Sequence, residues 1–218
     1  MTNPEAIRQA VTAGSLRYVE SQIRQALEEG FPAEAILSDC LLSGMRDAGN
    51  RYRDNDVYIP QILSSARCMR AGVELLRPHL QQGYWVQGKV ILGTVAGDLH
   101  DIGKNLVGIM IESTGVEVVD LGVDVPAKQF VRALYDHPDA SVVCLSCLLT
   151  TCRGNLTATM QLLRKAQKNR PFRIVIGGGA VNRQFADSEG ADAYTEDAVE
   201  AAEAVKQLIL RERGGGQP

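Results

Sequence analysis

The sequence predicts a helical bundle followed by a five-stranded parallel α/β domain of the flavodoxin-like (Rossmann-like) class. Over residues 1–82, apolar residues recur every three or four positions, the spacing of amphipathic helices. From Lys89 onward, short and continuously apolar runs alternate with helical stretches, as parallel strands buried on both faces do. Between the two parts lies a polar, glycine-containing segment, residues 81–88, which we interpret as a linker.

Three apolar stripes predict the helices of the first domain, residues 1–82. They comprise Leu16, Val19, Ile23 and Leu27; Leu37, Leu41, Met45, Ala48 and Tyr52; and Ile62, Ala66, Met69, Val73 and Leu76. Gly30 and Pro32 separate the first two stripes, as a C-terminal glycine and an early-helix proline do. A charged turn covers residues 51–56, and Pro60 opens the third helix. Such short connections favour an antiparallel bundle.

The second domain, residues 88–212, carries five predicted strands. They are expected over residues 89–95, 116–121, 141–145, 172–176 and 192–194, with a last helix over 196–210. With five strands, the order 2-1-3-4-5 is favoured, and it puts the topological switch between the first and third strands. Ligands should therefore meet the loops that leave these two strands. The glycine-rich residues 213–218 are expected to be a disordered tail.

Composition excludes several classes of function. The 218 residues carry a net charge of −3, so no basic footprint for nucleic acid or anionic lipid is present. No apolar run approaches the ~20 residues of a membrane span, and the first residues lack the pattern of a signal peptide. The five cysteines have no framework spacing, which predicts reduced thiols in a cytoplasmic protein.

The loop after the first strand carries the residues best suited to chemistry, in the run Gly97-Asp98-Leu99-His100-Asp101-Ile102-Gly103. A neutral imidazole such as that of His100 binds a transition metal through one nitrogen. The other nitrogen needs an acceptor, which Asp98 could supply. Gly97 and Gly103 remove side chains where a bulky group could approach. The Asp-x-His-x-x-Gly pattern alone is weak, but its place at the predicted switch point favours a ligand site.

Two later loops should reach the same crevice. Ser146 and Thr150 follow the third strand and offer hydroxyls, although these residues taken alone favour strand-end and helix-capping roles. Gly177 and Gly178 follow the fourth strand and form either a bare backbone wall or a tight turn. A dinucleotide fingerprint fits poorly, because Asn182 stands where its third glycine should be.

The cysteines of this region do not predict a zinc site. Cys144, Cys147 and Cys152 lack a nearby histidine to complete four ligands. Alternation along a strand would also direct Cys144 and Cys147 to opposite faces. We therefore interpret them as small buried apolar residues. His79 and His137 are expected to be solvated.

Together these motifs resemble the cobalamin-binding region of methionine synthase and, still more, the small corrinoid proteins of methanol, methylamine and methoxyarene methyltransferase systems. The resemblance rests on Gly-Asp-Leu-His-Asp-Ile-Gly-Lys-Asn and Asp-Leu-Gly-Val-Asp-Val-Pro within residues 90–126, Ser146-x-Leu-Leu-Thr150, the Gly177-Gly178 turn and residues 190–194. In the first domain, Gly44-Met45, Gly49, Tyr52 and residues 58–62 resemble a helical cap over the corrin. The match spans about residues 15–210.

The resemblance implies a cobalamin whose dimethylbenzimidazole arm is detached from cobalt, with His100 as the lower axial ligand. Asp98 matches the carboxylate that bonds this histidine, and Tyr52, Ile59 and Ile62 match cap positions over the methyl face. The implied cofactor-binding residues of the α/β domain are Gly97, Asp98, Leu99, His100, Asp101, Gly103, Ser146, Thr150, Gly177, Gly178 and Ala198. Cys152 stands where the methionine synthase relay has a hydroxyl, which leaves the relay's third member in doubt.

The resemblance further implies a methyl carrier that is not catalytic on its own. Its cobalt would cycle between methylcobalamin and cob(I)alamin, with His100 leaving the metal and Asp98 sharing a proton. The implied partners are a substrate-specific methyltransferase, an acceptor methyltransferase and a reductive activation protein. The methyl donor and the acceptor, tetrahydrofolate or a thiol such as coenzyme M, are not determined.

Two alternatives share the Asp-x-His-x-x-Gly loop. One is the cobalamin subunit of a carbon-skeleton mutase, which generally lacks the helical cap. The other is a cobalamin-sensing regulator, which would need an output module in place of that cap. A phosphorelay receiver is discarded, because the third strand ends without a phosphorylatable aspartate.

Overall fold

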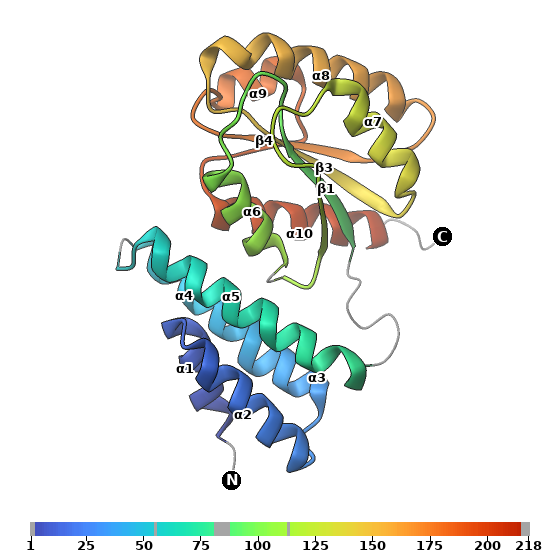
Figure 1. The fold of residues 1–218 in the computed structure, drawn as a ribbon. Helices are drawn as coiled ribbons and strands as arrows, with labels where there is room; N and C mark the ends of the chain where they lie inside the picture. Colours follow the sequence, from blue (N-terminus) through green and yellow to red (C-terminus); the bar gives the residue numbers. More distant parts are fainter. Residues whose placement is uncertain (1–2, 55, 81–87, 113, 215–218) are drawn as a thin grey trace. The chain divides into compact units, whose positions relative to one another are not determined.

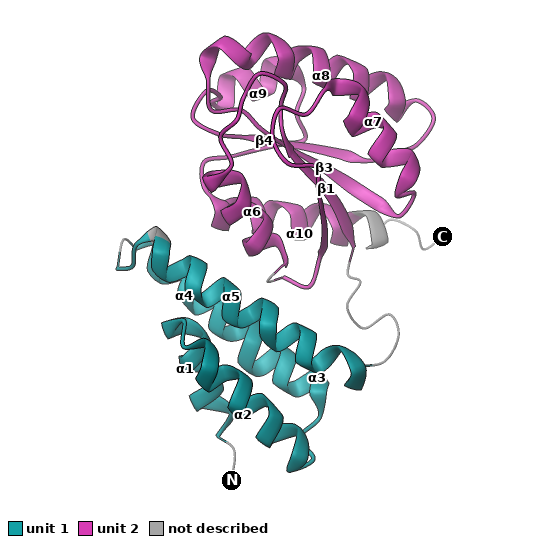
Figure 2. Ribbon diagram, viewed as in Figure 1, with its two compact units in different colours: residues 1–85 teal, residues 86–218 magenta. Residues whose placement is uncertain are grey.

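The computed structural model describes residues 3–54, 56–80, 88–112 and 114–214. The chain divides into two compact units, which we call the helical unit (Met1–Trp85) and the sheet unit (Val86–Pro218) (Figure 2). Of the expected linker, residues 81–87 lie outside the described residues. No helix in the described part of the chain has the length and apolar character that crossing a bilayer requires.

The helical unit contains more helix than the apolar stripes predicted. Its elements are α1 (Pro4–Ala13), α2 (Leu16–Glu28), α3 (Ala33–Ala35), η1 (Ile36–Leu42), α4 (Ser43–Arg53), α5 (Ile59–Leu76) and η2 (Arg77–His79). Helix α1 was not predicted, although it has clear end signals. The Asn3 side chain accepts a hydrogen bond from the Glu5 N–H, Pro4 opens the helix, and Gly14 ends it with φ of 74°.

The second stripe forms one run of three helical segments from Ala33 to Arg53. Its middle segment, η1, is a π-helix, in which hydrogen bonds span one residue more than in an α-helix. The third stripe forms α5, which begins at Ile59 with Pro60 in its first turn, as predicted. The Gln61 side chain accepts a hydrogen bond from the Tyr58 N–H at 2.9 Å and so caps the start of this helix.

The sheet unit has the predicted topology. Strands β1 (Lys89–Thr94), β2 (Glu117–Asp120), β3 (Ala140–Ser146), β4 (Arg173–Gly177) and β5 (Ala193–Thr195) pair in parallel, in the order β2-β1-β3-β4-β5. Its helices are α6 (Ile102–Glu112), α7 (Ala127–Asp136), η3 (Thr150–Cys152), α8 (Arg153–Gln167), α9 (Arg183–Glu189) and α10 (Ala198–Gly214). Helix α10 includes the first two residues of the segment 213–218 that was expected to be a tail, and residues 215–218 lie outside the described residues.

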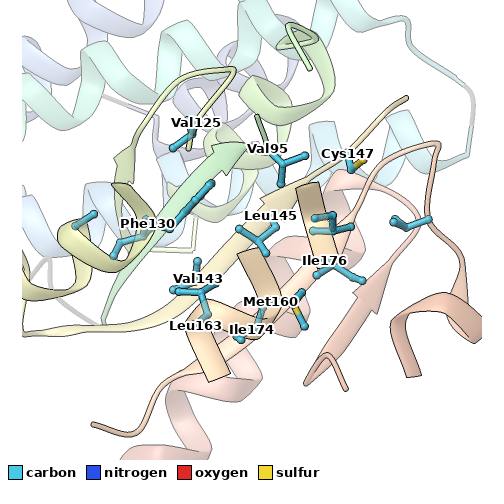
Figure 3. Packing of buried hydrophobic residues seen from close by; sticks show 14 of the residues in the cluster. Val95, Val125, Phe130, Val143, Leu145, Cys147, Met160, Leu163, Ile174 and Ile176 are labelled. Carbon is cyan, nitrogen blue, oxygen red and sulfur yellow. The ribbon is translucent and has the colours of Figure 1, made fainter. Parts of the chain in front are cut away.

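Helices cover both faces of this sheet, with α6 and α10 on one face and α7, α8 and α9 on the other (Figure 1). Under α7 and α8, alternate strand residues such as Val143, Leu145 and Ile176 pack against Phe130 and other buried helix residues (Figure 3). Because helices cover both faces of the sheet, ligands are expected at the carboxyl ends of β1 and β3, where the strand order reverses.

Candidate cofactor site

The site is formed where β1, β3 and β4 end side by side. The Val95 N–H donates to the Ser146 carbonyl at 3.1 Å, and the Cys147 N–H donates to the Gly177 carbonyl at 3.0 Å. The loop after β1 therefore begins against the end of β3, and the loop after β3 begins against the end of β4. This is the switch point that the sequence predicted.

The pairing of Asp98 with His100 is present. Oδ1 of Asp98 lies 2.7 Å from Nδ1 of His100 and also accepts the His100 backbone N–H at 3.1 Å. Asp98 is fully buried, whereas the His100 side chain is 52% exposed. A carboxylate can only accept from a neutral imidazole, so Nδ1 carries the proton and Nε2 keeps its lone pair. The exposed imidazole thereby keeps a nitrogen lone pair, as a metal ligand requires.

The second oxygen of Asp98 binds the loop after β3. Oδ2 accepts the backbone N–H of Leu148 at 2.6 Å and that of Leu149 at 3.3 Å. Burial alone would raise the pKa of Asp98. The hydrogen bonds from Leu148, His100 and Leu149 outweigh burial, so the pKa lies below its ordinary value. Asp98 thus remains an anion while it holds the histidine.

Further hydrogen bonds fix the main chain of the loop, and the sequence did not point to them. The buried Thr94 donates from Oγ1 to the His100 carbonyl at 3.0 Å. The Asn155 side chain donates to the Ala96 carbonyl at 2.7 Å. Asp124 Oδ1 accepts the Gly97 N–H at 2.6 Å. Of these residues, only Thr94 could have been singled out from the sequence, because its hydroxyl stands at the end of a largely apolar strand.

Large aliphatic side chains surround the histidine and face solvent. Leu99 and Ile102 are 71% and 64% exposed, and Leu148 and Leu149 are also exposed. Leu99 and Ile102 flank His100 in sequence, while the other two are held near it through Asp98. Several large apolar side chains exposed on neighbouring loops indicate a binding surface. A broad apolar ligand with a metal at its centre, such as a corrin ring, fits this arrangement.

The four glycines expected at the cofactor divide into two kinds. Three are required by the fold itself. Gly97 and Gly178 have positive φ values of 84° and 106°. A Cβ would lie 2.5 Å from the Cys147 carbonyl oxygen at Gly178, and 3.0 Å from the Thr195 carbonyl oxygen at Gly177. Gly103 differs, because a Cβ there would meet no heavy atom within 4 Å. Its lack of a side chain leaves open surface beside the histidine loop, which suits a bound group.

The remaining predicted residues of the sheet unit lie on the same loops. Ser146 ends β3, Thr150 begins η3, and their hydroxyls make no hydrogen bond to another described residue. Asp101 accepts from the Asn105 side chain at 3.2 Å, at the start of α6. Ala198 is buried at the start of α10. Free hydroxyls beside a bare glycine turn can bind the polar tail of a ligand.

The Cys152 thiol does not join the Asp98–His100 pair through any described hydrogen bond. Its sulfur lies 3.9 Å from Thr151 Oγ1, and it would be 3.3 Å from a Cβ at Gly97. Cys144 and Cys147 are buried, and burial raises their pKa to about 12 and about 11. Cys147 belongs to the hydrophobic cluster between the sheet and helices α7 and α8, and Cys144 does not. This agrees with the prediction that the two side chains point to opposite faces of the sheet. Among the described residues no cluster of metal-binding side chains occurs.

The three predicted cap residues belong to the helical unit. Tyr52 is half-buried on α4, and Ile62 is fully buried on α5. The side chain of Ile59 lies outside the described residues. The site geometry above therefore rests on the sheet unit alone.

Both halves of the chain match family models described as B12 binding domains, one over residues 88–205 and the other over residues 5–77. Among curated relatives, dimethylamine corrinoid protein 2 of Methanosarcina acetivorans is 34% identical over 194 residues, which cover 88% of this chain and 89% of the relative. Trimethylamine corrinoid protein 2 of the same organism is 32% identical over 206 residues, with coverages of 93% and 94%.

Solved structures agree with these relatives. The methanol:cobalamin methyltransferase complex of Methanosarcina barkeri contains a chain with a TM-score of 0.81 and 27% identity, covering 95% of this chain and 82% of its own length. A cobalamin-binding protein of Desulfitobacterium hafniense has a TM-score of 0.78 and 26% identity, with coverages of 95% and 99%. The chain therefore belongs to the B12-binding corrinoid proteins of methyltransferase systems.

Proposed function

We propose that this protein carries a methyl group on cobalamin, with the dimethylbenzimidazole arm detached from cobalt and His100 as the lower axial ligand. The observation that carries the proposal is the Asp98–His100 pair. Asp98 holds Nδ1 at 2.7 Å, which leaves the Nε2 lone pair of an exposed imidazole available to a metal. When bound, cobalamin supplies a cobalt centre that accepts a methyl group and later releases it.

Asp98 supports this role in both states of the histidine. While His100 is a ligand, the carboxylate raises its basicity through Nδ1. If His100 were released from the metal, the ionised Asp98 would stabilise a proton on the imidazole. Three backbone N–H groups also bind Asp98, and they would hold the carboxylate in place in either state.

The remaining predicted residues would hold the rest of the cofactor. Leu99 and Asp101 lie next to His100, where the exposed apolar side chains suit the corrin. Gly103, Ser146, Thr150, Gly177, Gly178 and Ala198 would line the pocket of the nucleotide tail, supported by the open surface at Gly103 and the free hydroxyls. Tyr52, Ile59 and Ile62 would cover the upper face. Ile62 is buried, so its contact would require a movement of α5.

The names of the relatives support methyltransferases as partners. One similar chain comes from a methanol:cobalamin methyltransferase complex, and others are named as methylamine corrinoid proteins. We propose that a substrate-specific methyltransferase loads the methyl group onto the cofactor held by this chain. An acceptor methyltransferase would remove it, and a reductive activation protein would restore cobalt that has been oxidised.

The test is to mix the purified protein with hydroxocobalamin, desalt it and record visible spectra. Wild type should retain the corrinoid, and His100→Ala should change the spectrum because cobalt loses its protein ligand. His79→Ala is the matched control, since His79 is an exposed histidine of the helical unit, and it should behave as wild type. A wild-type protein that retains no corrinoid contradicts the proposal.

The identity of the axial ligand needs a second measurement. Electron paramagnetic resonance of the one-electron-reduced cofactor shows splitting from the axial nitrogen. Growing the protein on ¹⁵N-histidine should change that splitting from a triplet to a doublet in wild type. An unchanged triplet would mean that the benzimidazole is still bound to cobalt.

A further inference from the structure

Asp124 has an unusual place in the sheet unit. It lies in the loop between β2 and α7, which runs beside the histidine loop through the parallel bridge between Val95 and Val125. Among the described residues, Asp124 is the one non-glycine residue with a positive φ, at 52°. Such a conformation is unfavourable for most side chains, and aspartate and asparagine tolerate it best.

Asp124 makes a reciprocal pair of hydrogen bonds with the histidine loop. Its Oδ1 accepts the Gly97 N–H at 2.6 Å. Its own backbone N–H donates to the Asp98 carbonyl at 3.0 Å. The left-handed backbone lets the side chain and the main chain of one residue engage two successive residues of the loop.

These bonds act on the residue that orients the cobalt ligand. The Asp98 side chain is bound by His100, Leu148 and Leu149, and its carbonyl by Asp124. Without the Asp124 side chain, the Gly97 N–H would lose its acceptor in the β2–α7 loop, while the backbone bond from residue 124 to the Asp98 carbonyl would remain. The main chain that leads into Asp98 would then be held less firmly, and the direction of the imidazole would be less restricted.

We propose that Asp124 is a positioning residue, which acts through Gly97 and Asp98 to hold His100 in the geometry for binding cobalt. The inference rests on the proposed function. It adds to the site a residue of a neighbouring loop that touches neither the histidine nor, on the proposed binding mode, the metal.

Three substitutions separate the hydrogen bond from the backbone conformation. Asp124→Asn keeps an acceptor oxygen and tolerates a positive φ, so it should resemble wild type. Asp124→Gly permits the same φ but removes the acceptor. Asp124→Ala removes both features. Asp187→Asn, on an exposed position of α9, is the control for the loss of a negative charge.

The readout is His100 ligation, measured in corrinoid-loaded protein by the visible spectrum and by the one-electron reduction potential of the bound cobalt. Loss of an outer hydrogen-bonding partner weakens a metal–ligand bond by about tenfold. Because the histidine stabilises the oxidised form, tenfold weaker ligation in Asp124→Gly should raise the potential by about 59 mV. Asp124→Asn and Asp187→Asn should keep the wild-type potential.

Thermal melting of each variant without corrinoid shows whether the variant is folded. If Asp124→Ala does not fold, Asp124→Gly alone is compared with wild type. Wild-type spectrum and potential in a folded Asp124→Gly protein would overturn the inference. A wild type that binds no corrinoid would overturn the proposed function first, and this inference with it. The wild-type measurement therefore separates the two failures.

Discussion

The helical unit and the sheet unit bury polar groups to different extents. Among the described residues of the helical unit, Ser65 is the one buried polar side chain, and it donates to carbonyls of Thr12 and Gln61. The sheet unit buries five, namely Thr94, Asp98, Lys104, Thr159 and Thr195. Two of these five, Thr94 and Asp98, bind the histidine directly.

This difference explains what each unit can contribute to a metal site. Apolar packing is not directional and tolerates small shifts of a helix. Buried hydrogen bonds are directional and costly to leave unmade, so they restrict a side chain to one geometry. His100, which we propose as the cobalt ligand, is accordingly held in the sheet unit by directional hydrogen bonds.

The largest expected effect tests whether each unit has its own core. Phe130→Ala and Leu41→Ala each remove a fully buried side chain, one per unit. We expect a loss of about 3–5 kcal/mol for phenylalanine and about 2–5 kcal/mol for leucine in the free energy of unfolding. Amide hydrogen exchange should show faster opening of the sheet unit in the first variant and of the helical unit in the second. Equal loss of protection in both units would contradict separate cores.

A smaller effect is expected from the polar network. In wild type, His100, Leu148 and Leu149 donate to the two carboxylate oxygens of Asp98. The amide of Asp98→Asn has only one oxygen, so at least one N–H is left without an acceptor. We expect a loss of about 2 kcal/mol at pH 7.

The pH dependence of that loss follows from the lowered pKa of Asp98. The stabilisation by the carboxylate is complete above the pKa of unfolded aspartate, about 3.9, and is lost as the pH falls through the lower folded pKa. Urea unfolding between pH 7 and pH 2 should therefore show the difference between wild type and Asp98→Asn narrowing below about pH 4. A difference that is constant with pH would mean that the charge is not its source.

The smallest effect distinguishes two glycines of the site. Gly103→Ala meets no atom in the protein, so it should raise the stability of the corrinoid-free protein by about 0.5–1 kcal/mol through helix propensity. It should also weaken corrinoid retention after desalting. Gly178→Ala should instead lower stability by more than about 1 kcal/mol, because φ is positive and the Cys147 carbonyl is too close. Unchanged retention in Gly103→Ala would remove this glycine from the proposed pocket.

Most of the fold was predictable because burial imposes a period on the sequence. Continuous apolar runs gave the five strands, and their alternation with helices gave the strand order. Helix α1 was missed, since Ile7, Ala10 and Val11 make a short stripe with few members. The π-helical η1 was missed for another reason. Its hydrogen bonds span one residue more than those of an α-helix, and the spacing of the apolar residues does not reveal this difference.

The site was predictable only where side chains carry its chemistry. Asp98 and His100 are two positions apart, so their pairing could be inferred from the loop alone. The donors on Leu148 and Leu149 are backbone N–H groups, which every residue but proline has and which therefore leave no mark in the sequence. The bond from Gly97 to Asp124 joins residues 27 positions apart and depends on the tertiary fold.

The hydrogen bond from Leu148 to Asp98 spans 50 positions of the chain and has a consequence for biosynthesis. His100 leaves the ribosome well before the residues that lock its carboxylate partner. Until β3 is made and has paired with β1, Asp98 lacks the backbone donors of Leu148 and Leu149, and only the bonds within its own loop restrict the imidazole. The geometry that we propose for ligating cobalt would therefore be completed only when this contact of high sequence separation forms. A nascent chain that ends before β3 would contain Asp98 and His100 but not the backbone donors of Leu148 and Leu149 that complete their geometry.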